Sequence, residues 1–302
     1  MIGRLASVLH RSSERRTAVD RYWADWTVNS TPFGSAAESE EYLEWRFLAY
    51  PGFRELTGFW GDHTGETIVD YGCGPGNDVV GFLLYTGAAK VIGFDVSPKA
   101  LGLAEQRIAL HEVDPTRFRL EKVDDSPPVS LPLPSGSVDF VNCQGVLHHV
   151  SDPEGILAEL RRVANPSARG VVMVYNRNSI YFHLYVAYMR MIDQGLFPGA
   201  TVEEAFTAST DGPDCPIARA YRPPEFVELC GRAGFAATFA GAYFAEPELA
   251  WLREHLDDAL ASPALGAEHQ AFLAALETDA DGLPTFDGVR AGIGGVYHLV
   301  PA

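Results

Sequence analysis

The most informative segment of the chain is Asp70-Tyr71-Gly72-Cys73-Gly74-Pro75-Gly76-Asn77. The apolar residues Ile68 and Val69 precede it and apolar residues at helical spacing follow over 77–85, so it predicts a turn from a buried strand into a helix. Three glycines within five positions let backbone N–H groups approach a ligand closely. The start of the following helix favours an anionic group at the same place. The stretch therefore predicts a cofactor cradle at the carboxyl end of the first strand of a parallel sheet.

Strand and helix patterns alternate on the carboxyl side of this turn. Apolar runs predict further strands at 91–94, 117–123, 138–143, 171–175, 235–244 and 294–300. Ser97 before Pro98 predicts the start of one helix, and Ser151-Asp152-Pro153-Glu154 predicts another as a capping box. Further helices are predicted at 224–233 and over 247–278. This alternation is typical of an α/β fold in which helices cover both faces of a parallel sheet.

Two segments decorate this predicted core. Residues 1–64 are rich in aromatic side chains and are predicted to form a helical N-terminal lid segment, of which the arginine-rich residues 1–16 are a mobile leader or a short helix. Residues 65–302 are predicted to form the main domain, with a helical cap inserted at about 178–222. Tyr181, Tyr185 and Tyr188 fall on one stripe of the cap, where they either pack in a core or face a substrate.

Composition restricts the function classes. The chain has 302 residues and a formal net charge of −17, and this acidity argues against binding to nucleic acid or to an anionic membrane, which needs clustered basic residues. No apolar run approaches the ~20 residues that span a bilayer. The four cysteines are scattered and contain no CxxC pair, which predicts reduced thiols and a cytoplasmic location.

The choice of cofactor depends on the residues around the glycine-rich turn. Asp95 ends the second predicted strand, where its carboxylate could accept hydrogen bonds from two ribose hydroxyls. A dinucleotide fingerprint would require glycine in place of Asn77. Asp70 would sit badly beside a pyrophosphate and instead suits a ligand that carries an ammonium group. These residues favour S-adenosylmethionine, and an NAD-type oxidoreductase is kept as an alternative.

The motifs together resemble those of class I S-adenosylmethionine-dependent methyltransferases, in the subgroup of small-molecule and ubiquinone or menaquinone enzymes. The resemblance covers about residues 66–175 and is carried by the segments 69–76, 93–97, 131–141, 144–150, 160–163 and 170–172. It implies a Rossmann-like, doubly wound and mostly parallel seven-stranded sheet whose last strand is antiparallel, and residues 297–300 are placed to form that strand.

The resemblance also implies a set of cofactor contacts, residue by residue. The methionine part would contact Asp70, Gly72 and Gly74, the ribose would contact Asp95, and the adenine would contact Val96. Either Asp124 or Asp125 would meet the adenine amino group, because Ser126-Pro127-Pro128 departs from the family pattern and leaves both open. Gln144 would line the end of the site where the methyl group is transferred.

The acceptor side is predicted less sharply. His149, His148 and Tyr22 are the candidates for a general base, and because the two histidines are adjacent, at most one of them faces the pocket. Asn176, Arg177 and Asn178 follow the fifth predicted strand and, with Tyr181, are candidate substrate contacts. No metal site is expected.

The predicted reaction is methyl transfer to an O, N or activated C nucleophile of a small molecule, such as a natural product, a sugar or a quinone-like acceptor. A non-catalytic S-adenosylmethionine-binding regulator is the other alternative. The aromatic N-terminal segment would allow an interface between two copies of the chain.

Overall fold

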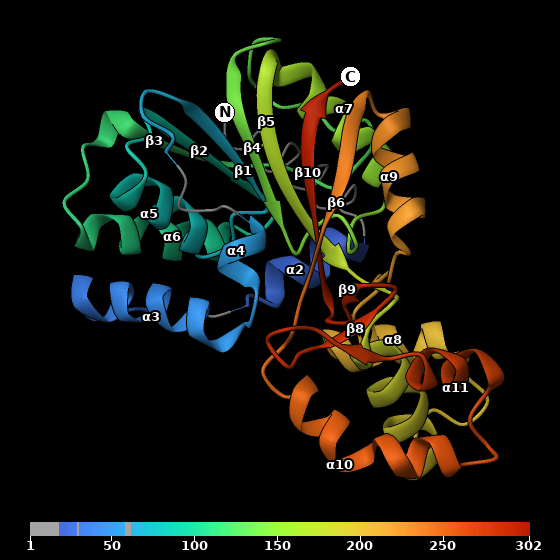
Figure 1. Ribbon diagram of the computed structural model, residues 1–302. Coiled ribbons are helices and arrows are strands. Elements are labelled where there is room, and N and C mark those ends of the chain that lie inside the picture. The colour runs from blue at the N-terminus through green and yellow to red at the C-terminus, as the bar shows by residue number, and fades with distance from the viewer. Residues whose placement is uncertain (1–17, 29, 58–61) are drawn as a thin grey trace, which may run out of the picture.

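The computed structural model describes residues 18–28, 30–57 and 62–302, with a seven-stranded sheet at the centre (Figure 1). The strand order is β3-β2-β1-β4-β5-β10-β6. The strands are β1 (Thr67–Tyr71), β2 (Lys90–Asp95), β3 (Phe118–Lys122), β4 (Val138–Gln144), β5 (Ala164–Tyr175), β6 (Phe235–Tyr243) and β10 (Gly294–Pro301). β10 pairs antiparallel with both β5 and β6, whereas the pairs from β3 through β5 are parallel. The predicted fold class and its antiparallel last strand are confirmed.

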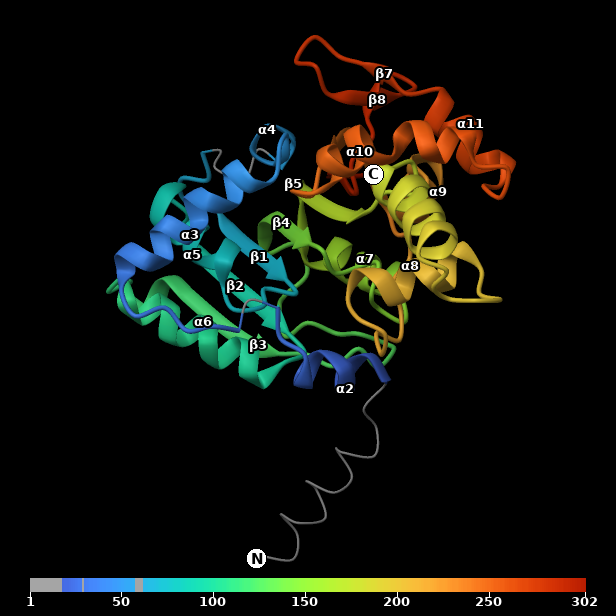
Figure 2. The same cartoon turned by 90° about the horizontal axis from the view of Figure 1, so that it is seen from below.

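Helices cover both faces of the sheet, as its apolar strands require. One face packs against α5 (Asn77–Tyr85), α6 (Pro98–Leu110), α3 (Ala36–Ala49) and α4 (Phe53–Thr57), and the other against α7 (Pro153–Val163) and α9 (Pro223–Arg232). Figure 2 shows α5 and α6 on the side of the sheet opposite α7 and α9. Fully buried residues such as Ile68 and Val69 show why β1 is almost continuously apolar, as expected for a strand covered on both faces.

The two predicted helix starts have different outcomes. Ser97 caps α6 as predicted, because its side chain accepts a hydrogen bond from the Ala100 N–H at 3.2 Å. The cap of α7 is Asp152 rather than Ser151: the Asp152 carboxylate accepts from the Gly155 N–H at 2.9 Å. The Ser151 hydroxyl instead donates to Asp125 at 2.7 Å, so the predicted capping box is wrong by one residue.

The cap is built from two parts of the chain. The first is the π-helix η2 (Tyr181–Asp193) with α8 (Val202–Thr210), inside the predicted insertion at 178–222. The second follows β6 and consists of α10 (Glu248–Ala261), α11 (Ala267–Ala274), β7 (Glu277–Thr278), β8 (Pro284–Phe286) and β9 (Val289–Arg290). Figure 1 shows the helices of both parts grouped below the sheet, and their side chains share one core. The helical prediction is wrong for residues 277–278, which begin a small three-stranded sheet.

The tyrosine stripe of the cap serves two purposes. Tyr185 stacks on Trp251 with ring centroids 4.1 Å apart, and Tyr188 is buried in the same core. Tyr181 instead reaches the cavity described below.

The buried side chain of Glu248 joins this cap to the sheet. Its carboxylate accepts backbone hydrogen bonds from Tyr181 at the start of η2, from Ala245 after β6 and from Ile293 before β10, at 2.7–3.2 Å. Burial nevertheless raises the pKa of Glu248 to about 8.

Glu248→Gln is expected to destabilise the protein by about 1–3 kcal/mol, because the amide NH₂ group faces backbone donors and leaves them without an acceptor. Urea unfolding would measure the loss.

The raised pKa of Glu248 also predicts that wild-type stability falls as the pH rises from about 5 through 8, since the folded state binds the extra proton. An unfolding midpoint that is the same in Glu248→Gln and in the wild type would contradict the structural role of this carboxylate.

Residues 1–17, 29 and 58–61, among them the predicted leader and Trp60, lie outside the described residues. The division into a lid segment over 1–64 and a domain over 65–302 stays a prediction. In the part of the chain that the structure describes, no helix combines the length and the apolarity needed to cross a bilayer.

Candidate active site

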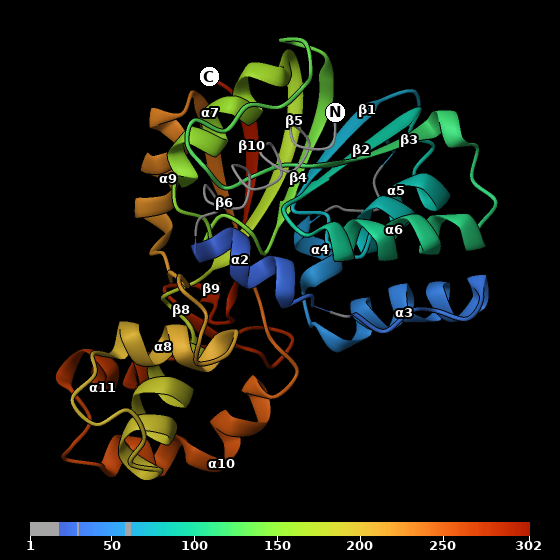
Figure 3. The ribbon, with the colours of Figure 1, turned by 180° about the vertical axis from the view of Figure 1, so that it is seen from behind.

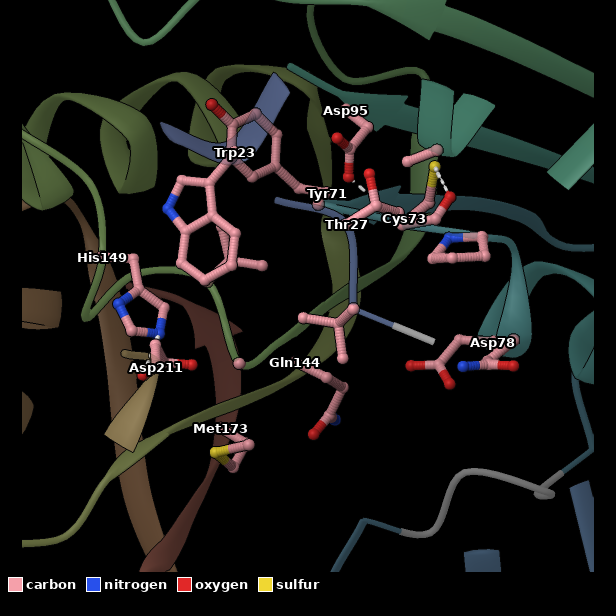
Figure 4. A pocket seen from close by; sticks show the side chains of 18 of the residues that line it. Trp23, Thr27, Tyr71, Cys73, Asp78, Asp95, Gln144, His149, Met173 and Asp211 are labelled. Carbon is pink, nitrogen blue, oxygen red and sulfur yellow. Dashed lines mark hydrogen bonds and ion pairs between the residues drawn. The ribbon is translucent and has the colours of Figure 1, made fainter. Parts of the chain in front are cut away.

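A cavity of about 540 Å³ opens at the carboxyl ends of β1, β2 and β4. The short helix α2 (Ala18–Asp25) lies at this end of the sheet, between the strands and the cap (Figure 3). Figure 4 shows Asp95 and Cys73 on one side of the cavity, His149 and Asp211 on the other, and Gln144 between them. The predicted cradle and the predicted histidine therefore share one space.

The glycine-rich turn forms one wall of the cavity, and a side chain at each of its glycines would meet different surroundings. Gly72, Gly74 and Gly76 all have positive φ angles, of 77°, 53° and 79°. A Cβ atom on Gly72 would lie 2.1 Å from Cγ2 of Val146, so this glycine allows the segment after β4 to pack against the turn. A Cβ atom on Gly74 would meet nothing within 4 Å and would enter open space at the cavity wall.

Asp95 lines the cavity and fixes the turn. One carboxylate oxygen accepts a hydrogen bond from the Gly74 N–H and the other accepts from the Ser97 N–H, both at 2.8 Å. Burial raises the pKa of Asp95 above its ordinary value, although hydrogen bonds from backbone N–H groups partly oppose this rise. The carboxylate that is predicted to contact the ribose thus also connects the glycine-rich turn to the start of α6.

We expect Asp95→Ala to weaken binding of S-adenosylhomocysteine about 10- to 100-fold, which is the loss of roughly 1.5–3 kcal/mol of charge-assisted hydrogen bonding. Titration calorimetry would give the affinity. Asp95→Asn should fall between the two proteins, because its amide oxygen still accepts one of the two backbone hydrogen bonds. If the wild type and Asp95→Ala bound S-adenosylhomocysteine with equal affinity, Asp95 would not be a ligand contact.

The hydrogen-bond partners of the Asp70 carboxylate show whether the cradle fits a ligand with an ammonium group. Its Oδ1 accepts a hydrogen bond from the Asn142 side chain at 2.8 Å, whereas its Oδ2 is buried at the cavity wall with no hydrogen-bond partner. Burial, and then the neighbouring Asp78, raise the pKa of Asp70 well above its usual value. Two buried carboxylates are balanced here by one guanidinium, that of Arg46, which pairs with Asp78. A ligand ammonium at Oδ2 would complete this cluster.

The structure separates Asp124 from Asp125. The Asp124 side chain is exposed, pairs with Lys122 and does not line the cavity. Asp125 is buried at the cavity wall, and its carboxylate accepts hydrogen bonds from the Ser151 N–H and hydroxyl. Asp20 of α2 accepts the Asp125 N–H at 2.8 Å. Of the two alternatives that the sequence left open, Asp125 lines the cavity, as Val96 does, and Asp124 does not.

Only one of the three candidate bases faces the cavity. His149 lines it, with Nδ1 2.7 Å from the Ile217 carbonyl oxygen and Nε2 3.4 Å from Asp211. His148 is fully buried outside it, where its Nδ1 accepts the Tyr175 N–H and its ring stacks on the Tyr175 ring at 3.7 Å. The hypothesis that His148 is a base is therefore wrong by position.

Tyr22 is also outside the cavity lining. Its hydroxyl donates to the Asp211 carbonyl oxygen, and burial, followed by nearby anions, raises its pKa to about 12. Tyr22 thus holds the loop that carries Asp211 and is a poor candidate for a base.

Three residues, two of which line the cavity, form the group of side chains that could hold a metal ion. Ligand-type atoms of His149, Asp211 and Cys215 lie within 4.8 Å of one another. However, Asp211 faces Nε2 of the imidazole while Cys215 Sγ lies 4.0 Å from Nδ1, which already bonds to Ile217. The carboxylate and the thiol therefore approach opposite edges of the ring and do not converge on one lone pair.

Three of the four predicted substrate contacts lie away from the cavity. The Asn176 amide donates to the carbonyl oxygens of Asn178 and Gly292, at 2.8 and 3.0 Å, and so fixes the turn after β5. Arg177 pairs with Glu203 and Glu268 of the cap. The reason is that the chain turns into the cap directly after Tyr175, so these polar residues stabilise the connection between β5 and the cap. Tyr181 does line the cavity.

Several cavity residues were not found from the sequence. Most of them are aromatic: Trp23, Trp26, Tyr50, Phe53, Tyr71, Tyr175 and Tyr243. The other missed residues that matter are Arg46, Asp78 and Met173. Trp23 packs on His149 with ring centroids 4.8 Å apart, which places the N-terminal aromatic cluster at the site. The one signal in the sequence was the concentration of aromatic residues before position 64.

Known proteins resemble this chain in sequence and in fold. A family described as a methyltransferase domain matches residues 62–207. The chain is 36% identical over 107 residues to an uncharacterized methyltransferase of Schizosaccharomyces pombe, covering 33% of this chain and 37% of that protein. It is 29% identical over 127 residues to a ubiquinone biosynthesis O-methyltransferase of Neisseria meningitidis, covering 42% of this chain and 51% of that enzyme. The chain thus spans about half the length, or less, of these relatives.

Two solved structures share the fold. One is a complex of a Haloferax volcanii methyltransferase with the Trm112 methyltransferase activator, with a TM-score of 0.51, 17% identity, and 88% of this chain and 94% of that chain covered. The other is the YcgJ protein of Bacillus subtilis, with a TM-score of 0.50, 13% identity, and 80% and 94% of the two chains covered. At these identities the likeness shows the fold alone.

Proposed function

The chain carries a class I S-adenosylmethionine-dependent methyltransferase domain, and from this premise we propose that the protein transfers a methyl group from S-adenosylmethionine to a small-molecule acceptor. The observation that carries the proposal is the continuity of the cavity. It runs from the glycine-rich turn and Asp95 to His149 and the aromatic residues beneath the cap. One space can therefore hold a donor and an acceptor side by side.

The donor half of the cavity fits the chemical groups of the cofactor. The partnerless Oδ2 of Asp70 suits the ammonium group of the methionine part, and Asp95 suits the ribose hydroxyls. Val96 and Asp125 line the part that would hold the adenine, and Gln144 the centre. The bound cofactor supplies a methyl group on a positively charged sulfonium, which is intrinsically reactive toward nucleophiles.

The protein's own contribution is mainly alignment and exclusion of water. Trp23 of α2 and Tyr181 of the cap both line the cavity, so elements outside the sheet help to cover an acceptor bound there. His149 is the residue placed to take a proton from an acceptor that must lose one.

A small molecule is the acceptor class that this cavity favours. The volume of about 540 Å³ suits a ligand of moderate size, and the −17 net charge disfavours RNA or DNA. The ubiquinone biosynthesis O-methyltransferase relative supports oxygen as the nucleophile. The four free cysteines support a cytoplasmic location, which is part of the same proposal.

Titration calorimetry with S-adenosylhomocysteine, with NAD in parallel, tests the cofactor. We expect micromolar binding of S-adenosylhomocysteine alone. Binding of NAD alone would replace the proposal with an oxidoreductase. Transfer of an isotope-labelled methyl group to an acceptor would then separate an enzyme from a regulator that only binds the cofactor.

A further inference from the structure

We propose that the acceptor is an uncharged aromatic molecule with a weakly acidic ring hydroxyl, and that His149 and Asp211 together accept the proton of that hydroxyl. This inference rests on the proposed function and adds the acceptor class and the role of Asp211.

Asp211 is held in place from several sides. It follows α8, and one oxygen of its carboxylate accepts the Tyr175 hydroxyl at 3.0 Å and lies 3.4 Å from Nε2 of His149. The Tyr22 hydroxyl donates to the Asp211 carbonyl oxygen. An aspartate in a glycine- and proline-rich loop would ordinarily move, so these contacts from β5 and α2 fix a carboxylate that would otherwise be mobile.

The hydrogen bonds of His149 decide which nitrogen is free. The Ile217 carbonyl oxygen can only accept, so the Nδ1 atom 2.7 Å away must carry the hydrogen. In the neutral ring the lone pair is then on Nε2, which faces Asp211 in the cavity wall (Figure 4). A proton that arrives at Nε2 creates an imidazolium directly against a carboxylate.

The groups around His149 keep its imidazole neutral until Nε2 receives a proton. The groups that face it are Asp211, Cys215, Arg219, His148 and Tyr175. Burial lowers the pKa of His149, Arg219 lowers it further and Asp211 opposes both. At neutral pH the ring is therefore available as a base.

The lining of the cavity excludes acceptors that carry an anionic group. Among the described residues that line it, Arg46 is the only lysine or arginine, and its guanidinium pairs with Asp78. A carboxylate or phosphate on the acceptor would thus have no free cation and would meet Asp211. Trp23, Tyr175 and Tyr181 instead present ring faces and edges suited to a flat apolar ligand.

Sugars are disfavoured by the same lining, because the hydroxyls of Tyr175 and Tyr181 already donate to Asp211 and to the Ser209 carbonyl oxygen. A single hydroxyl can be satisfied by the pair of His149 and Asp211.

The proton step balances without another reactant. The O–H bond of the acceptor breaks, its proton forms the N–H bond at Nε2 of His149, and the electron pair stays on oxygen. That oxygen then bonds the methyl carbon as the carbon–sulfur bond breaks and its electron pair stays on sulfur. The proton leaves His149 for solvent afterwards.

4-Nitrocatechol is the probe, because its absorption spectrum reports directly whether its hydroxyl is ionised. It is titrated at several pH values into the wild type and three variants, all saturated with S-adenosylhomocysteine: His149→Gln, Asp211→Asn and Asp214→Asn. Asp214 is exposed on the same loop, so it provides a matched control. We expect the bound probe in wild type and Asp214→Asn to ionise at a pH at least about one unit lower than free probe. In His149→Gln and Asp211→Asn that shift is expected to disappear.

Turnover of a phenolic acceptor gives an independent readout. His149→Gln is expected to lower kcat by ~10²–10⁴-fold, and Asp211→Asn to lower it by a smaller factor, with little change in KM for either. The inference is overturned if the wild type does not bind the probe, if it binds the probe without ionising it, or if Asp211→Asn behaves like Asp214→Asn. Binding of S-adenosylhomocysteine in the same samples shows whether the proposed function itself has failed. 4-Nitrobenzoate should bind far more weakly than the probe, and equal binding would overturn the acceptor class.

Discussion

Asp70→Asn is expected to weaken binding of S-adenosylhomocysteine about 10- to 100-fold and yet to leave the ligand-free protein as stable as the wild type, or more stable. The loss of affinity follows from the charge-assisted hydrogen bond that Oδ2 would make to the ligand ammonium, worth roughly 1.5–3 kcal/mol. Stability does not suffer, because asparagine keeps an oxygen for the bond from Asn142 and removes the repulsion between Asp70 and Asp78. Calorimetry and urea unfolding measure the two effects separately.

The same substitution should also change how the stability of the ligand-free protein depends on pH. The pKa of Asp70 is raised in the folded protein by burial and by Asp78, so the folded state binds a proton more readily than the unfolded chain. The stability of the ligand-free wild type should therefore fall as the pH rises above about 4, and Asp70→Asn should show a shallower decline.

Asp124→Asn is the control, because that side chain is exposed and paired only with Lys122. It should bind S-adenosylhomocysteine like the wild type. If Asp70→Asn kept full affinity, Asp70 would be a structural carboxylate and the ammonium assignment would be wrong.

Local patterns were enough to predict the sheet and the glycine-rich turn that lines the cavity. The turn at 72–76, the cap at Ser97 and the position of Asp95 after β2 each depend on residues near one another in sequence. In a parallel sheet the ends of neighbouring strands meet at one edge, so the prediction of these elements also places their residues together.

The acceptor half could not be predicted in the same way. Asp211 reaches His149 only because the loop after α8 folds back over the site, and Trp23 reaches it from the other end of the chain. Such contacts depend on the packing of the cap and of α2, which no local pattern specifies. Asn176 and Arg177 show the converse error: they follow a strand of the sheet, yet the turn into the cap takes them away from the cavity.

Gly72→Ala is expected to have the largest effect on stability in the glycine-rich turn, a loss of about 2–5 kcal/mol. A Cβ atom there would lie 2.1 Å from Cγ2 of Val146, and overpacking of this kind typically costs ~1–3 kcal/mol. The φ angle of 77° adds roughly 1–2 kcal/mol of backbone strain. Urea unfolding of the ligand-free protein measures the sum.

A double-mutant cycle with Val146→Ala separates the two contributions. Removing the Val146 methyl groups should recover the overpacking term but not the backbone strain, so the doubly substituted protein should be more stable than Gly72→Ala. If Val146→Ala gave no recovery, the close contact would not be the cause of the loss.

Gly74→Ala should show the opposite pattern from Gly72→Ala. Its new Cβ atom would meet no protein atom within 4 Å, so the stability loss should be limited to about 1–2 kcal/mol of strain at a φ of 53°. That atom would instead enter the space where the methionine part of the cofactor is proposed to lie, so affinity for S-adenosylhomocysteine should fall more than stability does. The two glycines of one turn would then be distinguished by function, Gly72 by packing against the protein and Gly74 by leaving room for the ligand.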